Sequence, residues 1–389
     1  MRYTATMARD ETFWNGIYGA FDPSETLIGE RSNALYCERP DSPFDAMAVH
    51  FRPGRPSRRP PLAHLTGHRG SGKSSLLWRL VKHFRDDYFI VYFDIAHNTD
   101  SSQVNLVDLL FVLGASLFEV AQDEGLEPDS DLLGGLAKAV SLLTIREKAE
   151  RGEGLDLVQA AGRLICFGAR QLGAEELAEK LTKAYLEPFD FSSGVTEETL
   201  VERRHEPQLR DIVNWINLII ADIEALSGKK ILVAVDGLDK LSRLEQAQQI
   251  FLHSQALRQP LCRMIYTVPM LLYTDLAFGQ AEEDCRTFPL PNVQVHTRKG
   301  RKSSKGQALM IEVASRRLAS LGLSQDELFT RSALDLLIRK SGGVFRWFVA
   351  MVREAAEQAE ISEKERIDIT CAVVSRVKSI LWKMRDPQG

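Results

Sequence analysis

The residues best suited to chemistry form one glycine-rich segment, Gly67 to Ser74, with the sequence GHRGSGKS. This segment matches the pattern GxxxxGK[ST], in which glycines let backbone N–H groups turn inward around a phosphate. The amine of Lys73 would reach the β- and γ-phosphates of a nucleotide, and the hydroxyl of Ser74 would ligate Mg²⁺. We therefore expect a site for ATP and Mg²⁺. Its expected binding residues are Gly67, His68, Arg69, Gly70, Ser71, Gly72, Lys73, Ser74 and Ser75.

The residues on either side of this segment have the patterns of a strand and of a helix. Residues 62–66 are a short apolar run, which is typical of a buried strand. After the glycine-rich segment, apolar residues recur at helical spacing at Leu76, Leu77, Leu80, Val81 and Phe84. This order places the positive N-terminus of a helix beside a bound phosphate. The alternative interpretation is a glycine-rich turn with an incidental lysine.

A second motif supplies the acid that a nucleotide-bound metal needs. Residues 231–235 are five consecutive apolar residues, and Asp236 follows them directly. An acid at the end of such a strand can hold Mg²⁺ through water, and we expect Asp236 to do so together with Ser74. Taken alone, the same pattern also describes a buried strand that ends in an ordinary turn.

Together the two motifs resemble the P-loop NTPases of the additional-strand class, in which the acid-bearing strand is not adjacent to the strand before the loop. The run Asp236-Gly237-Leu238-Asp239 is similar to the DGLD of NACHT and related signal-transduction (STAND) ATPases, although Lys240 stands where many of those have Glu. AAA+ proteins usually place a catalytic Glu directly after the metal-binding Asp, where this chain has Gly237. The resemblance implies that Asp239 polarises the attacking water and that hydrolysis is slow. The alternative role for Asp239 is a solvated turn residue.

The resemblance also implies two residues that sense the γ-phosphate. In these ATPases a polar residue at the end of the next strand does so, and Thr267 holds that place in residues 264–268; the arginine that NACHT-like proteins show shortly afterwards is absent. Residues 341–348 resemble the glycine turn and arginine that open a lid helix in origin-recognition-type AAA+ proteins, which makes Arg346 a second sensor. The expected catalytic residues are thus Lys73, Asp239, Thr267 and Arg346. The alternatives are an ordinary strand threonine and a solvated arginine beside an apolar helix face.

An arginine finger that reaches into a neighbouring subunit would come from the segment before the last strand. Arg286 lies in that segment, and no spacing rule excludes Arg258 or Arg263.

The remaining pattern predicts an α/β fold with a parallel sheet, and the resemblance implies a three-layer α/β/α core with a helical insertion and a C-terminal all-α lid. Further strands are expected at residues 88–95, 264–268 and, less clearly, 293–296. Ser324 and Glu327 have the spacing of a capping box at a helix start. We expect residues 1–61 to be a lead-in with a Pro/Arg-rich loop, 62–300 the core, 103–227 a largely helical insertion, and 301–389 the lid.

Composition limits the partners. The chain has 389 residues, a net charge of −4 and 44% hydrophobic residues, which fits a globular protein without a global basic field. No apolar run reaches the ~18 residues that a membrane span needs, and the start of the chain lacks an apolar signal core, so we expect a cytoplasmic protein with no membrane partner. Two basic segments, Arg52–Arg59 and Arg298–Lys305, could contact DNA phosphates or could be solvated loops.

These observations favour an ATP-dependent switch that hydrolyses ATP and couples nucleotide state to self-association or to a separate effector protein. The NACHT-like motif implies a setting in prokaryotic defence or signalling. Two alternatives stay open: an AAA+ ATPase that acts on DNA as a loader or regulator, and a nucleotide-binding scaffold with negligible hydrolysis.

Overall fold

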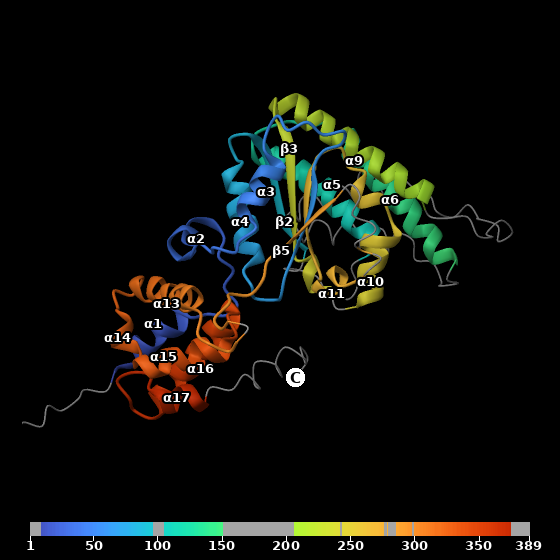
Figure 1. The fold of residues 1–389 in the computed structure, drawn as a ribbon. Helices are drawn as coiled ribbons and strands as arrows, with labels where there is room; N and C mark the ends of the chain where they lie inside the picture. The colour runs from blue at the N-terminus through green and yellow to red at the C-terminus, as the bar shows by residue number, and fades with distance from the viewer. Residues whose placement is uncertain are drawn as a thin grey trace, which may run out of the picture. The chain divides into compact units, whose positions relative to one another are not determined.

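The computed structural model describes residues 9–95, 105–150, 206–241, 243–275, 278, 285–297 and 299–374 (Figure 1). The chain divides into two compact units. One, called the sheet unit here, comprises residues 46–66 and 79–288; the other, the helical unit, comprises residues 1–45, 67–78 and 289–389. Each unit therefore combines segments that are far apart in the sequence.

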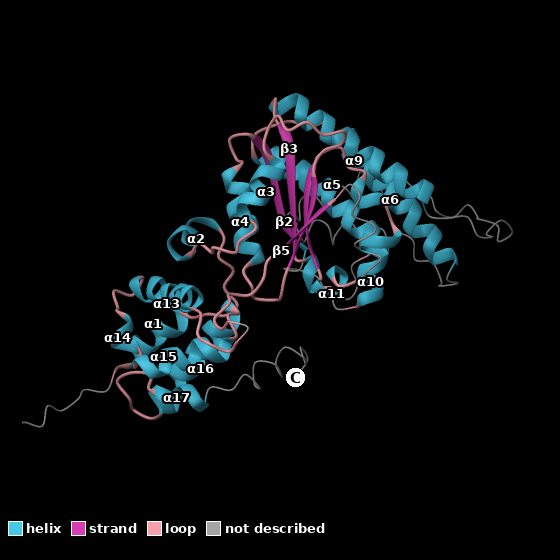
Figure 2. Cartoon of the chain, viewed as in Figure 1, coloured by secondary structure: helices cyan, strands magenta, loops and turns pink. Residues whose placement is uncertain are grey.

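The sheet unit is built on a five-stranded parallel sheet with the order β2-β3-β4-β1-β5, drawn in magenta in Figure 2. The strands are β1 (Leu62–Thr66), β2 (Tyr88–Asp94), β3 (Lys230–Asp236), β4 (Arg263–Val268) and β5 (Arg286–Pro289). Strand β4 pairs with both β1 and β3, so the strand before the glycine-rich segment and the strand that ends in the acid are separated by one strand. This confirms the expected α/β class and the expected non-adjacency of the two strands.

The strands form where the sequence is continuously apolar, because both faces of a parallel sheet are buried. The side chains of residues 231–235 in β3 are fully buried, and those of β4 after its first residue are nearly so. The four strands expected at residues 62–66, 88–95, 231–235 and 264–268 are confirmed, with ends shifted by at most one residue.

The strand expected at residues 293–296 is wrong, and the fifth strand is β5 at Arg286–Pro289. Val293 and Val295 are buried in the core of the helical unit instead of in the sheet. The N–H of Val293 donates to the carbonyl oxygen of Gly343 at 3.1 Å, and His296 forms only an isolated antiparallel bridge with Lys302. The alternating apolar pattern of this segment therefore reflects packing against helices.

Three long helices of the sheet unit pack on one another and on the sheet. They are α5 (Leu106–Asp123), α6 (Ser130–Glu150) and α9 (Glu206–Ser227), of which α5 contacts β2 and α9 contacts β3. Small residues let them approach closely: a β-carbon at Gly114 would lie 2.3 Å from Cδ2 of Leu136. The described parts of the segment 103–227 are thus helical, as expected, and residues 151–205 lie outside the described residues.

The remaining helices of this part of the chain are short. They are α3 (Phe44–Phe51), α10 (Leu244–Gln248) and α11 (Met270–Tyr273). Tight 3₁₀ turns occupy Leu238–Lys240 and Ala256–Arg258, and a wider π-helical turn occupies Gln249–His253. Helix α4 (Lys73–His83) begins in the helical unit and ends in the sheet unit.

The helical unit combines the N-terminal and C-terminal helices. These are α1 (Glu11–Ala20), α2 (Gly29–Leu35), α13 (Ser304–Ala319), α14 (Gln325–Leu328), α15 (Arg331–Ser341), α16 (Phe345–Ile361) and α17 (Ile369–Val374). Trp14 and Ile17 of α1 are buried in the same core as Phe348 and Val352 of α16. This division joins α1 and α2 to the C-terminal helices, and the domain boundaries expected at residues 61 and 300 stay predictions.

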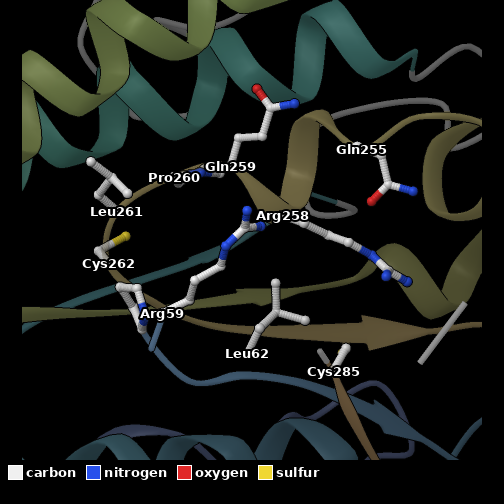
Figure 3. A pocket seen from close by; sticks show the side chains of 10 residues that line it. Arg59, Leu62, Gln255, Arg258, Gln259, Pro260, Leu261, Cys262 and Cys285 are labelled. Carbon is white, nitrogen blue, oxygen red and sulfur yellow. The ribbon is translucent and has the colours of Figure 1, made fainter. Parts of the chain in front are cut away.

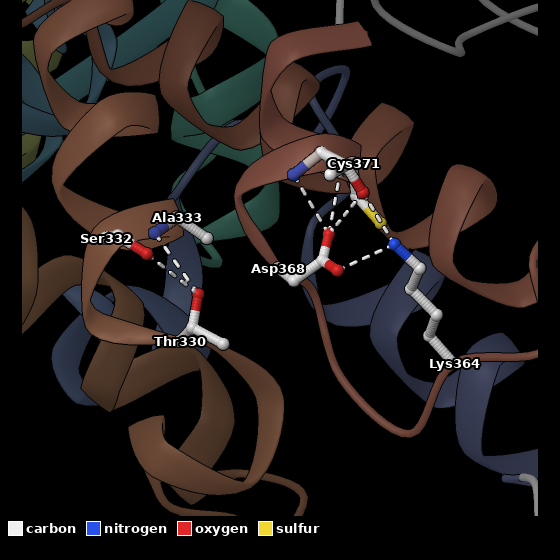
Figure 4. A network of polar contacts seen from close by, with 7 residues as sticks. Thr330, Ser332, Ala333, Lys364, Asp368 and Cys371 are labelled. Carbon is white, nitrogen blue, oxygen red and sulfur yellow. Dashed lines mark hydrogen bonds and ion pairs between the residues drawn. The ribbon is translucent and has the colours of Figure 1, made fainter.

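Polar side chains fix the starts of these helices (Figure 4). The N–H of Ser324 donates to Oε2 of Glu327 at 2.7 Å, which confirms the capping box at α14. Thr330 caps α15 by accepting from the N–H of Ala333 at 3.3 Å. Burial opposes the charge of Asp368, but hydrogen bonds from Lys364, Thr370 and Cys371 outweigh it and hold the pKa of Asp368 below its usual range. Across the described residues, the helices are all too short or too polar to cross a membrane.

Candidate functional site

The glycine-rich segment, residues 67–74, is called the phosphate loop here; it follows β1 directly and leads into α4. Gly70 has φ +84° and Gly72 has φ +96°, backbone angles that residues with a β-carbon rarely adopt. The spacing of glycines in the sequence therefore has a direct conformational cause at these two positions. The loop belongs to the helical unit.

The loop closes around the ammonium group of Lys73. Its Nζ donates to the carbonyl oxygens of Gly67 at 2.8 Å and His68 at 3.0 Å, and the residue is 5% exposed. The hydroxyl oxygen of Ser71 is buried without a hydrogen-bond partner among the residues that the structure describes. A buried cation and a buried hydroxyl that has a proton to donate are the groups that fit anionic oxygens.

The other expected loop residues are more accessible. His68 and Arg69 are exposed at the outer turn, and Ser74 and Ser75 are half-buried in the first turn of α4. Ser74 thus stands where its hydroxyl can reach a metal held at the N-terminus of that helix.

The first turn of α16 lies against the phosphate loop within the same unit. The N–H of Arg346 donates to the carbonyl oxygen of Gly70 at 3.3 Å. A β-carbon at Gly70 would lie 2.6 Å from Cβ of Arg346, and one at Gly72 would lie 3.5 Å from the ring of Phe345. The structure therefore brings Arg346 beside the loop, and the contact runs through its backbone and its β-carbon.

A glycine pair makes this approach possible. Gly342 ends α15 with φ +58°, and Gly343 follows with φ +78°. A β-carbon at Gly343 would lie 1.8 Å from the carbonyl oxygen of Val293, so no larger residue fits there. The pair singled out in the sequence thus sets the direction in which α16 begins.

In the sheet unit, Asp236 lies at the carboxyl end of β3 and is 1% exposed. Its Oδ1 accepts from the N–H of Gly237 at 2.8 Å, and its Oδ2 accepts from the hydroxyl of Tyr92 at 3.1 Å. Burial raises the pKa of Tyr92, and the charges of Asp236 and Asp94 raise it further, so the phenol stays neutral and keeps a proton to donate. A buried carboxylate with defined donors is an arrangement suited to hold a hydrated Mg²⁺.

Two residues near Asp236 were not found from the sequence. Asp94 ends β2 in register with Asp236, and Tyr92 lies two residues before it on the same face of the strand. Lys240, the residue that departs from the NACHT pattern, forms an ion pair with Asp94, with 3.3 Å between Nζ and Oδ2. An acid at the end of each of two strands is the pattern that could have identified Asp94. Asp239 lies half-buried in the turn that contains Lys240.

Thr267 lies near the end of β4, where its side chain is fully buried. Its hydroxyl donates to the carbonyl oxygen of Val235 at 3.5 Å, and its register partner on β1 is Leu65. Because the strands are parallel, β1, β3 and β4 all end at this edge of the sheet. Thr267 and Asp236 therefore lie at the edge where the chain leaves β1 to form the phosphate loop.

The candidate finger residues lie elsewhere. Arg258 precedes β4 and Arg263 begins it, at the opposite edge from Asp236, while Arg286 begins β5 and is exposed. A pocket of about 200 Å³ lies beside Arg59 and Arg258. Leu62, the first residue of β1, lines it (Figure 3). This pocket is therefore separate from the edge that carries Asp236 and Thr267.

The two basic segments differ in their surroundings. The four arginines of Arg52–Arg59 are all exposed. In the second segment Arg298 lies outside the described residues, and Lys302 forms an ion pair with Asp335 at 2.7 Å. Lys305 belongs to α13.

Comparisons with known proteins find a similarity among solved structures alone. No protein-family model matches it, and no curated protein matches it. Among solved structures, it is similar to a chain in a structure titled "Structure of Drosophila ORC bound to DNA", with 11% sequence identity and a TM-score of 0.40. That likeness covers 98% of this chain and 70% of the other. The parallel sheet and the glycine-rich loop at the end of β1 are compatible with a P-loop NTPase.

Proposed function

We propose that this protein is a Mg²⁺-dependent ATPase of the P-loop NTPase type that acts as a slow molecular switch. The observation that carries the proposal is the phosphate loop at the end of β1, with a buried acid at the end of β3 and β4 between the two strands. This combination of loop and strand order supports nucleotide binding more directly than either motif does alone.

In the proposed site, Lys73 exchanges its contacts with the carbonyl oxygens of Gly67 and His68 for contacts with the β- and γ-phosphates. The buried hydroxyl of Ser71 donates to a phosphate oxygen, which gives this group the partner that it lacks among the described residues. Ser74 and Asp236 hold Mg²⁺, which supplies neutralisation of the phosphate charge when it is bound.

The remaining expected residues complete the reaction. Asp239 orients and polarises the attacking water, and Thr267 and Arg346 contact the γ-phosphate. Because Gly237 follows Asp236 directly, no glutamate occupies the position next to the metal-binding acid. We therefore expect slow hydrolysis of ATP, which suits a molecular switch.

The proposed output is a change in the C-terminal helices, which serve as the lid. Support comes from the contact between Gly70 and Arg346, because a loop that rearranges around phosphate must also move the first turn of α16. The change would control self-association or a separate effector protein in the cytoplasm, in a prokaryotic defence or signalling setting.

DNA is a second candidate partner because the four arginines of residues 52–59 are exposed. Duplex DNA that binds there would lose affinity steeply as salt rises. The third candidate, a nucleotide-binding scaffold, is supported by Gly237 and predicts binding without turnover.

The test is steady-state phosphate release from the purified protein with Mg·ATP, beside the Asp239→Asn and Lys73→Ala variants. We expect slow release that both variants abolish, and Lys82→Ala, an exposed lysine of α4, serves as the matched control. Repeating the assay with duplex DNA at about 50 mM and about 200 mM salt tests the second candidate. Tight binding of ATP without release would favour the scaffold, and release that is unchanged in Lys73→Ala would overturn the proposal.

A further inference from the structure

Arg39 is buried in the helical unit, in the segment between α2 and α3 that the sequence pattern left unassigned. Its side chain is 4% exposed. A guanidinium group in such a place is unfavourable unless its N–H groups find acceptors. The partners of Arg39 therefore indicate why an arginine is placed there.

One side chain contacts three segments that are distant in the sequence. Nη1 donates to the carbonyl oxygen of Ser71 at 2.9 Å, and Nη2 donates to the carbonyl oxygen of Pro291. Cζ lies 5.4 Å from the centre of the Phe345 ring, and Asp41 lies 3.6 Å away as the counter-ion. Arg39 thus joins the phosphate loop, the segment before α13 and the first residue of α16.

The contact with Ser71 fixes the orientation of one peptide in the loop. In a trans peptide the carbonyl oxygen of Ser71 and the N–H of Gly72 point in opposite directions. A guanidinium that holds this oxygen therefore directs the N–H of Gly72 away from Arg39. Gly72, at φ +96°, lies where glycine has the freedom to rotate, so an external contact is needed to select one orientation. Oriented N–H groups are the main phosphate ligands of such loops.

We propose that Arg39 is a positioning residue of the phosphate loop, which holds the Ser71–Gly72 peptide ready for a nucleoside triphosphate and links it to α16 through Phe345. This inference rests on the proposed function for its ligand. The N-terminal segment then contributes a residue to the nucleotide site. A change in the loop would reach the C-terminal helices through the side chain of Arg39 as well as through the backbone contact between Gly70 and Arg346.

The experiment compares Arg39→Gln and Arg39→Lys with a matched control, Arg353→Gln. Arg353 lies on α16, and its ion pair with Asp22 is exposed and 3.7 Å long. The first measurement is hydrogen exchange of a peptide that covers residues 67–76 in the nucleotide-free protein. The second is the Kd for Mg·ATP, measured at a temperature at which each variant is folded.

We expect Arg39→Gln to exchange faster in the loop peptide and to raise the Kd roughly tenfold, the effect of losing a charge-assisted hydrogen bond. Arg39→Lys should give an exchange rate and a Kd between those of the unmodified protein and those of Arg39→Gln, because one ammonium group cannot keep both carbonyl contacts in the same geometry. Arg353→Gln should change neither measurement. If Arg39→Gln does not fold, Arg39→Lys decides by the same two measurements.

Unchanged loop exchange and unchanged Kd would overturn the inference. Faster exchange throughout α1, α15 and α16 with an unchanged Kd would also overturn it, because Arg39 would then support the fold alone. If the unmodified protein binds no Mg·ATP, the proposed function fails, and the exchange of residues 67–76 still decides whether Arg39 orders the loop.

Discussion

The N–H of Arg346 donates to the carbonyl oxygen of Gly70 at 3.3 Å, so the first turn of α16 rests on the phosphate loop. The two residues are 276 positions apart in the sequence, yet they belong to one compact unit. A ligand that shifts the loop between two conformations must favour one of two placements of α16 as well. This contact is the physical basis of the proposed coupling between nucleotide state and the C-terminal helices.

Replacing Gly70 with alanine should impair nucleotide binding beyond its effect on stability. The substitution forces a β-carbon into a left-handed backbone, which costs about 1 kcal/mol, and places that carbon 2.6 Å from Cβ of Arg346. We expect a Kd for Mg·ATP raised at least roughly tenfold, as for displacement of a well-placed group by about an ångström. Isothermal titration and chemical denaturation of the same samples measure both effects.

Gly322→Ala is the control for this change. Gly322 has φ +71°, and a β-carbon there would meet nothing within 4 Å. It should therefore lose about 1 kcal/mol of stability to the left-handed backbone alone and bind Mg·ATP normally. Equal affinities of the two variants for Mg·ATP would contradict the prediction, because the loop would then bind nucleotide equally well with a β-carbon at Gly70.

Tyr92→Phe should lower the affinity for the Mg²⁺ that accompanies ATP binding. The change removes the hydroxyl that donates to Oδ2 of Asp236 at 3.1 Å and leaves the carboxylate less firmly oriented. Partners of this kind change metal affinity by roughly tenfold, so the Mg²⁺ concentration for half-maximal binding should rise by about that factor. A magnesium titration at fixed ATP measures it.

The matched control is Tyr266→Phe. Tyr266 is also buried, and its hydroxyl donates to the carbonyl oxygen of Leu257 at 3.0 Å, away from Asp236. Both variants should lose about 1 kcal/mol of stability. A magnesium response that is the same in both would contradict the assignment of Asp236 as the metal-holding acid.

His64 should make the sheet unit lose stability as pH falls. It lies in β1 among Phe251, Tyr266 and Phe278, and burial, with a smaller effect of Arg258, lowers its pKa from 6.5 to about 3. Between these values the unfolded chain binds a proton that the folded chain does not, so acidification favours unfolding. The loss between pH near 7.5 and pH near 5.5 should be about 1.4 kcal/mol from this group.

Urea unfolding at the two pH values measures this loss. His64→Phe removes the titrating group and should reduce the difference between the two pH values by that amount. A pH dependence of the His64 variant equal to that of the unmodified protein would contradict the burial of a neutral imidazole.

The strands around the site could be predicted from the sequence because each is a continuous apolar run bounded by turns. Residues 231–235 and 264–268 show this pattern, and they form β3 and β4. Residues 293–296 instead alternate apolar and polar residues, as a half-buried strand does, and they form no strand because Val293 and Val295 pack against helices. An alternating apolar pattern indicates which side chains are buried, but it does not show whether they are buried in a sheet or against helices.

The positions of Arg39 and Tyr92 could not be predicted, since each depends on contacts between distant segments. Arg39 meets Ser71, and Tyr92 meets Asp236, only after the chain has folded. Arginine and tyrosine outside a motif give no sign of such partners. The phosphate loop could be recognised because its glycines and Lys73 lie within eight consecutive residues, 67–74, so that its pattern needs no contact between distant segments.

The most direct test of the central claim is the equilibrium binding of Mg·ATP to the unmodified protein, Lys73→Ala and Lys82→Ala. The two lysines lie in the same helix, and Lys82 is exposed in its last turn while Lys73 is enclosed by the loop. We predict that Lys73→Ala loses binding and that Lys82→Ala retains it. Binding that survives in Lys73→Ala, or that is absent from the unmodified protein, would contradict the assignment of residues 67–74 as a nucleotide site.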